Sequence, residues 1–375
     1  MFPTTISPNL DGHNPKVYSC QPNSVIELSR QKKTLFGFQW HITSRCNLRC
    51  LHCYQENYSG TDELDLDSLK RIADEIALTL AKWGKKGDIA ITGGEPLLKE
   101  ELFPLIDYIV AFDEVASIDL LSNGTLIDAN VVERLAKIGK LRCVQVSLDG
   151  GSDRSNDAIR GKGSFEKALL GIRLLRREGI QVNVMFTLQR INFAEIGPII
   201  DLAAREDVRF LTIERFVPSG SGCKIKENML TSDEIRKAFN YISERANQQI
   251  REKGYTVITR SRPLWGICHD KCSDMTLSRD DVGGICSIGL DGLCILQDAT
   301  VLPCRRLPIP IGNLKSDSLL KIWHTSSLLW EIADKRNLKG KCNRCTLIGK
   351  CSGCRAMAYA SSGDYLAEDP QCFKI

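Results

Sequence analysis

The sequence lacks the segments that direct a chain into or across a membrane. No apolar run reaches the roughly 18 residues that a membrane-spanning helix needs. The N-terminal stretch MFPTTISPNLDGHNPK has no basic region followed by an apolar core, so no signal peptide is predicted. These two absences predict a cytoplasmic, reducing location and no membrane partner.

Net charge is also nearly absent. The 50 Lys and Arg residues almost balance the 46 Asp and Glu residues, which leaves +4 over 375 residues. So small an excess gives no broad basic surface, and no nucleic-acid partner is predicted. The sequence contains no low-complexity tract, and no repeat beyond a rhythm of strands and helices. The hydrophobic content of 43% is ordinary for a globular chain with a large core.

Cysteine, by contrast, is abundant. The chain has 16 cysteines, and a reducing setting makes a disulfide framework a poor explanation for them. Metal ligation explains the count better.

Short apolar strands alternate with amphipathic helical stretches after an irregular lead-in over residues 1–35. This alternation predicts an α/β fold with a parallel sheet, and six such units favour an open, partial (β/α)6 TIM barrel over residues 36–255. A cysteine-rich, irregular domain is predicted over residues 256–375, with the boundary within 253–265. The expected strands are 37–43, 88–92, 116–121, 141–147, 180–187 and 208–214, and the expected helices are 64–81, 100–112, 128–138, 164–178, 193–205 and 231–252.

A polar face recurs on four of these strands, because side chains alternate along a strand. Parallel strands are normally covered on both faces, so the pattern predicts a hydrated cavity that holds a sizeable ligand. The residues concerned are Gln39, His41, Thr43, Cys143, Gln145, Ser147, Asn183, Met185, Thr187, Thr212 and Glu214.

The stretch CNLRCLHCY places Cys46, Cys50 and Cys53 directly after the first strand. Active sites of barrel folds lie at this end of the strands. Three local cysteines leave one iron of a [4Fe–4S] cluster without a protein ligand, and that iron is open to a cofactor or substrate. The motifs TGGEP (92–96), LSNGT (121–125) and SLDG (147–150) then end the next three strands.

Together these motifs resemble the radical S-adenosylmethionine (SAM) superfamily. The resemblance implies that the three cysteines bind a [4Fe–4S] cluster, that SAM chelates the open iron, and that its reductive cleavage yields a 5′-deoxyadenosyl radical. No catalytic residue is assigned. The implied cofactor contacts are Gly93, Gly94 and Glu95 for the amino group, Ser147 and Arg160 for the carboxylate, Asn123 for cofactor or substrate, and Tyr54 for adenine.

A second set of cysteines lies near the C-terminus, around the core CNRCTLIGKCSGCRA. Two Cys-x2-Cys pairs alone could bind zinc. With the first motif, the pattern instead resembles the SPASM extension of radical maturases, which carries auxiliary [4Fe–4S] clusters. The resemblance implies two of them: an outer cluster on Cys342, Cys345, Cys351 and Cys372, and an inner one on Cys286, Cys304 and Cys354. The fourth inner ligand is Cys268 or Cys272, or that iron is open to a substrate thiolate.

Four cysteines remain outside both sets. Cys294 is expected to be a small core hydrophobe, and Cys143 could contact substrate from the inward face. Cys20 and Cys223 have no assigned role.

Arg305 and Arg306 follow Cys304. Sulfatase maturases have an acidic catalytic residue just after the matching cysteine. This chain has none there, and that absence argues against formylglycine formation. These arginines could bind a carboxylate or an acidic peptide segment.

The leading prediction is a radical SAM maturase that takes hydrogen from a ribosomally made precursor peptide and forms a thioether or other cross-link. Only 45 residues precede Cys46, too few for a leader-recognition domain, so leader binding is expected to need a separate partner protein or to use the barrel surface. A flavodoxin or ferredoxin would be the low-potential electron donor. The alternatives are a tetrapyrrole-modifying radical enzyme of the haem pathway, with His41 and His52 as candidate ligands, and a non-catalytic zinc scaffold.

Overall fold

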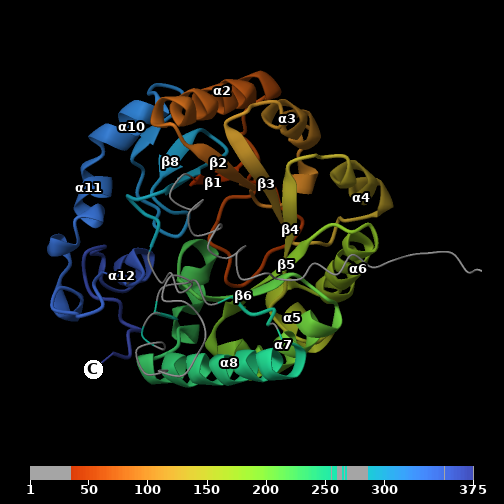
Figure 1. Cartoon of the computed structure of the whole chain (residues 1–375), viewed down its shortest axis with the longest axis vertical. Helices are drawn as coiled ribbons and strands as arrows, with labels where there is room; N and C mark the ends of the chain where they lie inside the picture. The colour runs from red at the N-terminus through yellow and green to blue at the C-terminus, as the bar shows by residue number, and fades with distance from the viewer. Residues whose placement is uncertain are drawn as a thin grey trace, which may run out of the picture.

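The computed structural model describes residues 35–254, 256–259, 264, 265, 267, 286–349 and 351–374. Six parallel strands form an open barrel, and the helices lie outside it in a ring (Figure 1). The predicted α/β class and partial barrel are confirmed. The strands are β1 (Leu35–His41), β2 (Lys86–Thr92), β3 (Val115–Ser122), β4 (Leu141–Ser147), β5 (Val182–Leu188) and β6 (Phe210–Arg215).

The barrel helices lie close to the predicted ranges. They are α2 (Leu66–Trp83), α3 (Leu102–Ile109), α4 (Ala129–Ala136), α5 (Asp153–Arg160), α6 (Ser164–Arg177), α7 (Ile196–Arg205) and α8 (Ser232–Lys253). The sequence did not predict α5, which buries only Asn156, Ile159 and Arg160 and so lacks an apolar stripe.

The core lies between the outer face of the sheet and the helices. In α2, apolar residues recur at helical spacing, and Leu69, Ile72, Ile76 and Leu80 are buried. The side chain of Asp65 accepts a hydrogen bond from the Ser68 N–H and so caps the start of this helix. Such caps and apolar stripes hold the strands in place and leave their inner faces for a ligand.

The cysteine-rich region adds strands to the barrel sheet. Strand β7 (Gly292–Ile295) pairs parallel to β1, so that Gln39 lies between Ala90 of β2 and Cys294 of β7. Strands β8 (Thr300–Leu302) and β9 (Gly312–Asn313) follow antiparallel, giving the order β6-β5-β4-β3-β2-β1-β7-β8-β9. The sequence did not predict this pairing.

The helices of the cysteine-rich region occupy the side of the ring that the barrel helices leave open (Figure 1). They are α10 (Leu319–Thr325), α11 (Ser327–Ala333) and α12 (Arg355–Ser362). Short 3-10 turns η1 (Pro96–Leu98), η2 (Arg190–Glu195), η3 (Gly220–Asn228), η4 (Lys335–Asn337) and η5 (Gly340–Cys342) join the elements. Within the described part of the chain, none of the helices combines the length and the apolar character required to cross a membrane.

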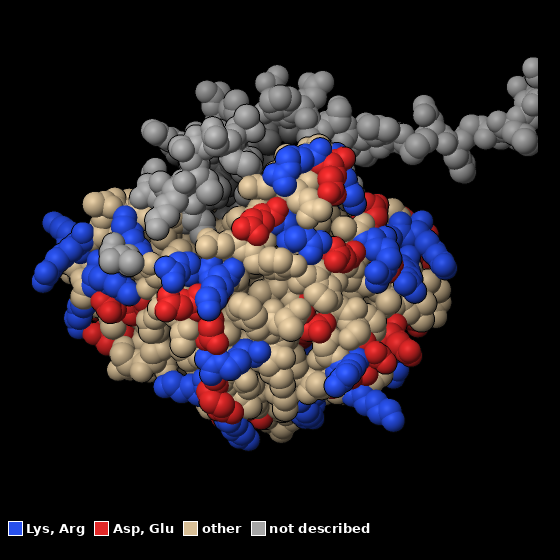
Figure 2. All heavy atoms as spheres, turned by 90° about the horizontal axis from the view of Figure 1, so that it is seen from below, with Lys and Arg blue, Asp and Glu red and all other residues tan. Residues whose placement is uncertain are grey.

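Charged side chains of both signs are interspersed over one face of the molecule (Figure 2). On that face neither sign forms a continuous patch.

Candidate active site and cysteine groups

Cys46, Cys50 and Cys53 lie in the loop that follows β1 and line one cavity at that end of the barrel. The loop is anchored to α5, because the Leu51 N–H donates to the Ile159 carbonyl at 3.0 Å. The Leu48 N–H lies 3.4 Å from the Cys46 Sγ, and such a donor favours a thiolate. This donor set suits an iron–sulfur cluster, whose ligands must be thiolates.

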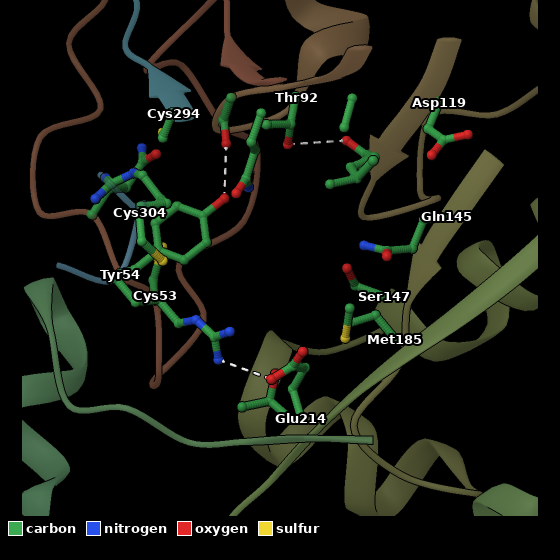
Figure 3. Close-up of a pocket in the computed structure, with 18 of the residues that line it drawn as sticks. Cys53, Tyr54, Thr92, Asp119, Gln145, Ser147, Met185, Glu214, Cys294 and Cys304 are labelled. Carbon is green, nitrogen blue, oxygen red and sulfur yellow. Dashed lines mark hydrogen bonds and ion pairs between the residues drawn. The ribbon is translucent and has the colours of Figure 1, made fainter. Parts of the chain in front are cut away.

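The cavity measures about 780 Å³ and is formed largely by the inward faces of the strands (Figure 3). Its size lies toward the upper end of the roughly 300–1,000 Å³ that small-molecule sites occupy. Six of the predicted inward residues line it, namely Gln39, Gln145, Ser147, Met185, Thr187 and Glu214.

The other predicted inward residues do not line the cavity, and the contacts of three of them explain why. The His41 ring packs edge-on against the Tyr54 ring at 5.6 Å, and Tyr54 is the residue that faces the cavity. Cys143 donates to Asp119 and accepts from Asn183, both at 3.2 Å. The remaining two, Thr43 and Thr212, are buried.

Gly93 and Gly94 line the cavity, and close backbone packing explains why both are glycines. A Cβ on Gly93 would lie 2.4 Å from the Thr43 carbonyl oxygen, and one on Gly94 would lie 2.3 Å from that of Arg45. The Gly94 N–H donates to the Thr43 carbonyl at 2.9 Å. The pair therefore holds the cysteine loop against the end of β2.

Glu95 does not reach the cavity. Its carboxylate is fully buried and accepts from the Ser122 hydroxyl at 2.9 Å and the Asn123 N–H at 2.7 Å. Burial raises the pKa of this carboxyl to about 7. In this structure Glu95 orders the end of β3, and its contact with a cofactor stays a prediction.

Asn123 and Ser147, two of the predicted cofactor contacts, line the cavity. A residue that contacts a cofactor in the cavity has to lie at its wall. The Asn123 amide donates to the Asn47 side chain at 2.8 Å and lies 3.9 Å from the Cys46 Sγ. Ser147 lies across the cavity from Cys53 and Tyr54 (Figure 3).

Arg160 also lines the cavity, but it is already paired within the chain. Its Nε lies 2.7 Å from the Asp149 Oδ2, and its Nη1 lies 3.9 Å from the Cys50 Sγ. The His52 Nε2 lies 3.4 Å from the same Asp149 oxygen, and burial lowers the pKa of His52. Burial raises the pKa of the Cys50 thiol to about 11, and the Arg160 charge opposes that rise. The sequence did not predict the role of Asp149, although it lies in the quoted SLDG motif.

The predicted inner group, Cys286, Cys304 and Cys354, comes together from three separate segments. Burial raises the pKa of the Cys286 thiol to about 12, and the neighbouring Cys354 and Cys304 add to this rise. Cys304 also lines the main cavity. The fourth candidates, Cys268 and Cys272, lie outside the described residues, as does Cys20.

The predicted outer group surrounds a second cavity of about 560 Å³, lined by Cys342, Cys345, Cys351 and Cys372. The Leu347 N–H lies 3.4 Å from the Cys345 Sγ, and the Gly353 N–H lies 3.3 Å from the Cys351 Sγ. These donors again favour thiolates.

The described residues contain no group of three or more His, Cys, Asp or Glu with the spacing of a single metal ion's ligands. Cluster thiolates each bind a different iron, so they need not satisfy that spacing.

Two cysteines outside these groups differ in exposure. Cys223 is exposed, whereas Cys294 is buried on β7, as expected, but also contributes to the cavity wall.

Arg305 and Arg306 both line the main cavity. The Arg305 guanidinium carbon lies 4.4 Å from the centre of the Tyr54 ring. Arg306 pairs with Glu214, with 3.1 Å between Nη1 and Oε2. Both contacts bring the segment after Cys304 against the barrel interior.

Two family matches cover most of the barrel and part of the cysteine-rich region. Residues 40–203 match the Radical SAM superfamily, and residues 286–355 match SPASM, an iron–sulfur cluster-binding domain.

The relatives by sequence include an AdoMet-dependent heme synthase of Methanosarcina barkeri, 30% identical over 89% of this chain and 95% of that protein. A mycofactocin maturase of Mycobacterium tuberculosis is 28% identical over 94% of this chain and 86% of that protein.

Two solved structures share the fold. Streptococcus suis SuiB bound to the precursor peptide SuiA has a TM-score of 0.72 and 17% identity, covering 98% of this chain and 85% of that one. The protein anSMEcpe with bound AdoMet has a TM-score of 0.71 and 18% identity, covering 90% of each chain. Identity this low supports the shared fold and no finer conclusion.

Proposed function

Because the chain belongs to the radical SAM superfamily and carries a SPASM iron–sulfur domain, we propose that it modifies a side chain of an iron-containing tetrapyrrole. Peptide maturation, the leading prediction from the sequence, becomes the second candidate. The relatives support this ranking of the two candidates. Three AdoMet-dependent heme synthases, an Fe-coproporphyrin III synthase and a pre-heme d1 synthase each match over 89–94% of this chain.

The cavity offers features that a tetrapyrrole would use. Thioether and imidazole groups are common axial ligands of haem iron, and both Met185 and His52 line the cavity. His41, the other candidate from the sequence, is buried behind Tyr54. Arg305 adds positive charge at the cavity wall, which suits the acidic groups that a porphyrin such as coproporphyrin carries on every ring.

SAM and its [4Fe–4S] cluster, when bound, supply a 5′-deoxyadenosyl radical that takes hydrogen from a substrate carbon. In the proposal, Cys46, Cys50 and Cys53 hold that cluster. Asp149 holds the Arg160 side chain in position, and the Arg160 charge then offsets part of the negative charge of the Cys50 thiolate. Asn123 and Ser147 then remain as side chains that orient SAM.

The inner and outer cysteine groups would hold two auxiliary clusters. Cys304 of the inner group lines the main cavity, which supports an auxiliary cluster within reach of a substrate radical. A low-potential flavodoxin or ferredoxin would supply the electrons.

The proposal is tested by adding iron coproporphyrin III to the anaerobically reconstituted protein. We expect a saturable shift of the Soret band. Addition of SAM and a reductant should then yield 5′-deoxyadenosine together with a tetrapyrrole of altered mass. Formation of 5′-deoxyadenosine with no Soret shift and no tetrapyrrole product would contradict the proposal.

Peptide maturation is supported by the mycofactocin maturase among the relatives. The same reconstituted protein, incubated with a precursor peptide encoded beside it, would then give a peptide of altered mass.

A further inference from the structure

Arg305 stands between the first cysteine loop and the inner cysteine group. It directly follows Cys304, and its guanidinium lies over the ring of Tyr54, which directly follows Cys53. Both side chains line the main cavity. The contact is a cation–π interaction, and it holds the guanidinium at the cavity wall.

Arg305 lacks the anionic partner that the other cavity arginines have. Among the residues that the structure describes, every other arginine lining the cavity is ion-paired, and no carboxylate pairs with Arg305. The pairs are Arg142 with Asp88 at 2.8 Å, Arg160 with Asp149 at 2.7 Å, Arg215 with Asp369 at 2.9 Å and Arg306 with Glu214 at 3.1 Å.

The Arg305 Nε is buried and has no hydrogen-bond partner. The residue as a whole is half-buried, and a buried guanidinium nitrogen without a partner costs free energy that a bound anion offsets. The planar array of guanidinium N–H donors matches a carboxylate. An anion that enters the cavity would supply the missing partner.

We propose that Arg305 binds a carboxylate of the substrate and orients the substrate in the cavity, and that under the proposed function this group is a propionate of an iron tetrapyrrole. The location of Arg305 favours a carboxylate of the substrate over the carboxylate of SAM. Tyr54 and Cys304 lie on one side of the cavity, and Ser147, the candidate for the SAM carboxylate, lies on the other (Figure 3). Arg305 thereby sets which end of the substrate lies beside Cys304.

The test compares two porphyrins and four forms of the anaerobically reconstituted holoenzyme: wild type, R305Q, R305K and R245Q. The porphyrins are iron coproporphyrin III and its propionamide analogue, which lacks the carboxylates. Wild type should bind the acid more tightly than the amide. The R305Q substitution should raise the Kd for the acid roughly 10- to 100-fold, as loss of a hydrogen bond to a charged group does, and should leave the Kd for the amide unchanged.

R245Q is the matched control, because Arg245 also lies over a tyrosine ring, that of Tyr241, at 5.9 Å, and is paired with Asp201 on the outer helices. Its affinities should equal those of wild type. R305K keeps the charge without the planar fork and should give an intermediate Kd for the acid. Iron and sulfide contents of all variants establish that the clusters are assembled.

The outcomes separate this inference from the proposed function. If wild type binds neither porphyrin, the proposed function is overturned, and this inference with it. If wild type binds the acid and R305Q retains both the Kd and the preference for acid over amide, Arg305 does not bind the carboxylate. A weakened affinity for SAM with unchanged porphyrin binding in R305Q would assign the guanidinium to the cofactor and would also overturn the inference.

Discussion

Arg215, at the end of β6, and Asp369, near the C-terminus, form a buried two-pronged ion pair. The two contacts measure 2.9 and 3.1 Å, and both side chains are almost fully buried. Asp369 also accepts from the Cys354 N–H at 2.8 Å. One carboxylate thus ties the last barrel strand to the inner cysteine group.

Breaking this pair should destabilise the protein strongly. In D369N the charge of Arg215 stays buried without its carboxylate, and we expect a loss of about 3–5 kcal/mol in the free energy of unfolding. Denaturant unfolding of the holoenzyme measures it. The double variant R215M/D369N should recover part of the loss, because no uncompensated charge remains. A D369N protein as stable as wild type would show that the pair contributes nothing.

The three cysteine groups should assemble independently of one another. In C46A/C50A/C53A, we expect the protein to lose about four irons per chain and all SAM cleavage, and to keep the iron of the other groups. Iron, sulfide and zinc analyses after anaerobic reconstitution measure this. C223A is the control, since Cys223 is exposed and outside the groups. Zinc without sulfide in wild type would reject the cluster assignment and favour a zinc scaffold.

Glu95 should make stability fall as the pH rises. Burial raises its pKa from 4.5 to about 7, so between these values the folded protein holds a proton that the unfolded chain releases. The stabilisation is complete below pH 4.5 and is lost as the pH rises through about 7, by about 3 kcal/mol.

E95Q resembles the protonated carboxyl and should remove this dependence. Relative to wild type, E95Q should therefore gain stability between about pH 5.5 and about pH 8, as measured by denaturant unfolding at both values. E133Q, at an exposed position of α4, is the control. A constant difference between E95Q and wild type would show that Glu95 is already ionised at the lower pH.

Arg355 should raise the reduction potential of the outer group. It is fully buried, donates to the carbonyls of Tyr365 and Ala367 at 3.0 and 2.8 Å, and lies 4.0 Å from the Cys342 Sγ. A reduced cluster carries more negative charge, which a nearby cation stabilises. R355M should therefore lower the potential by on the order of 50 mV.

A redox titration followed by electron paramagnetic resonance measures this shift. R336Q is the control, because Arg336 is exposed, lines neither cavity and has its charge screened by water. Equal potentials in R355M and wild type, at equal iron content, would contradict the prediction.

The sequence predicted those parts of the molecule whose pattern is local. Alternation and helical spacing placed the strands and most helices, and the resemblance to the SPASM extension grouped the cysteines that line the outer cavity. The contacts made by Arg160 and Arg215 were not predicted, because their partners Asp149 and Asp369 lie on other elements and no local pattern marks an ion pair. Helix α5 was missed for lack of an apolar stripe, and β7 because four residues are too few to show a period.

The pairing of β7 with β1 has a consequence for how the protein is made. The first strand leaves the ribosome early, yet one of its edges is completed by residues roughly 250 positions later. At typical synthesis rates that edge waits roughly ten to fifty seconds, with unpaired backbone groups and the apolar residues of β1 beside it. The nascent chain therefore passes through a long window in which it is open to aggregation or to chaperone binding, and the window closes only when the cysteine-rich region emerges.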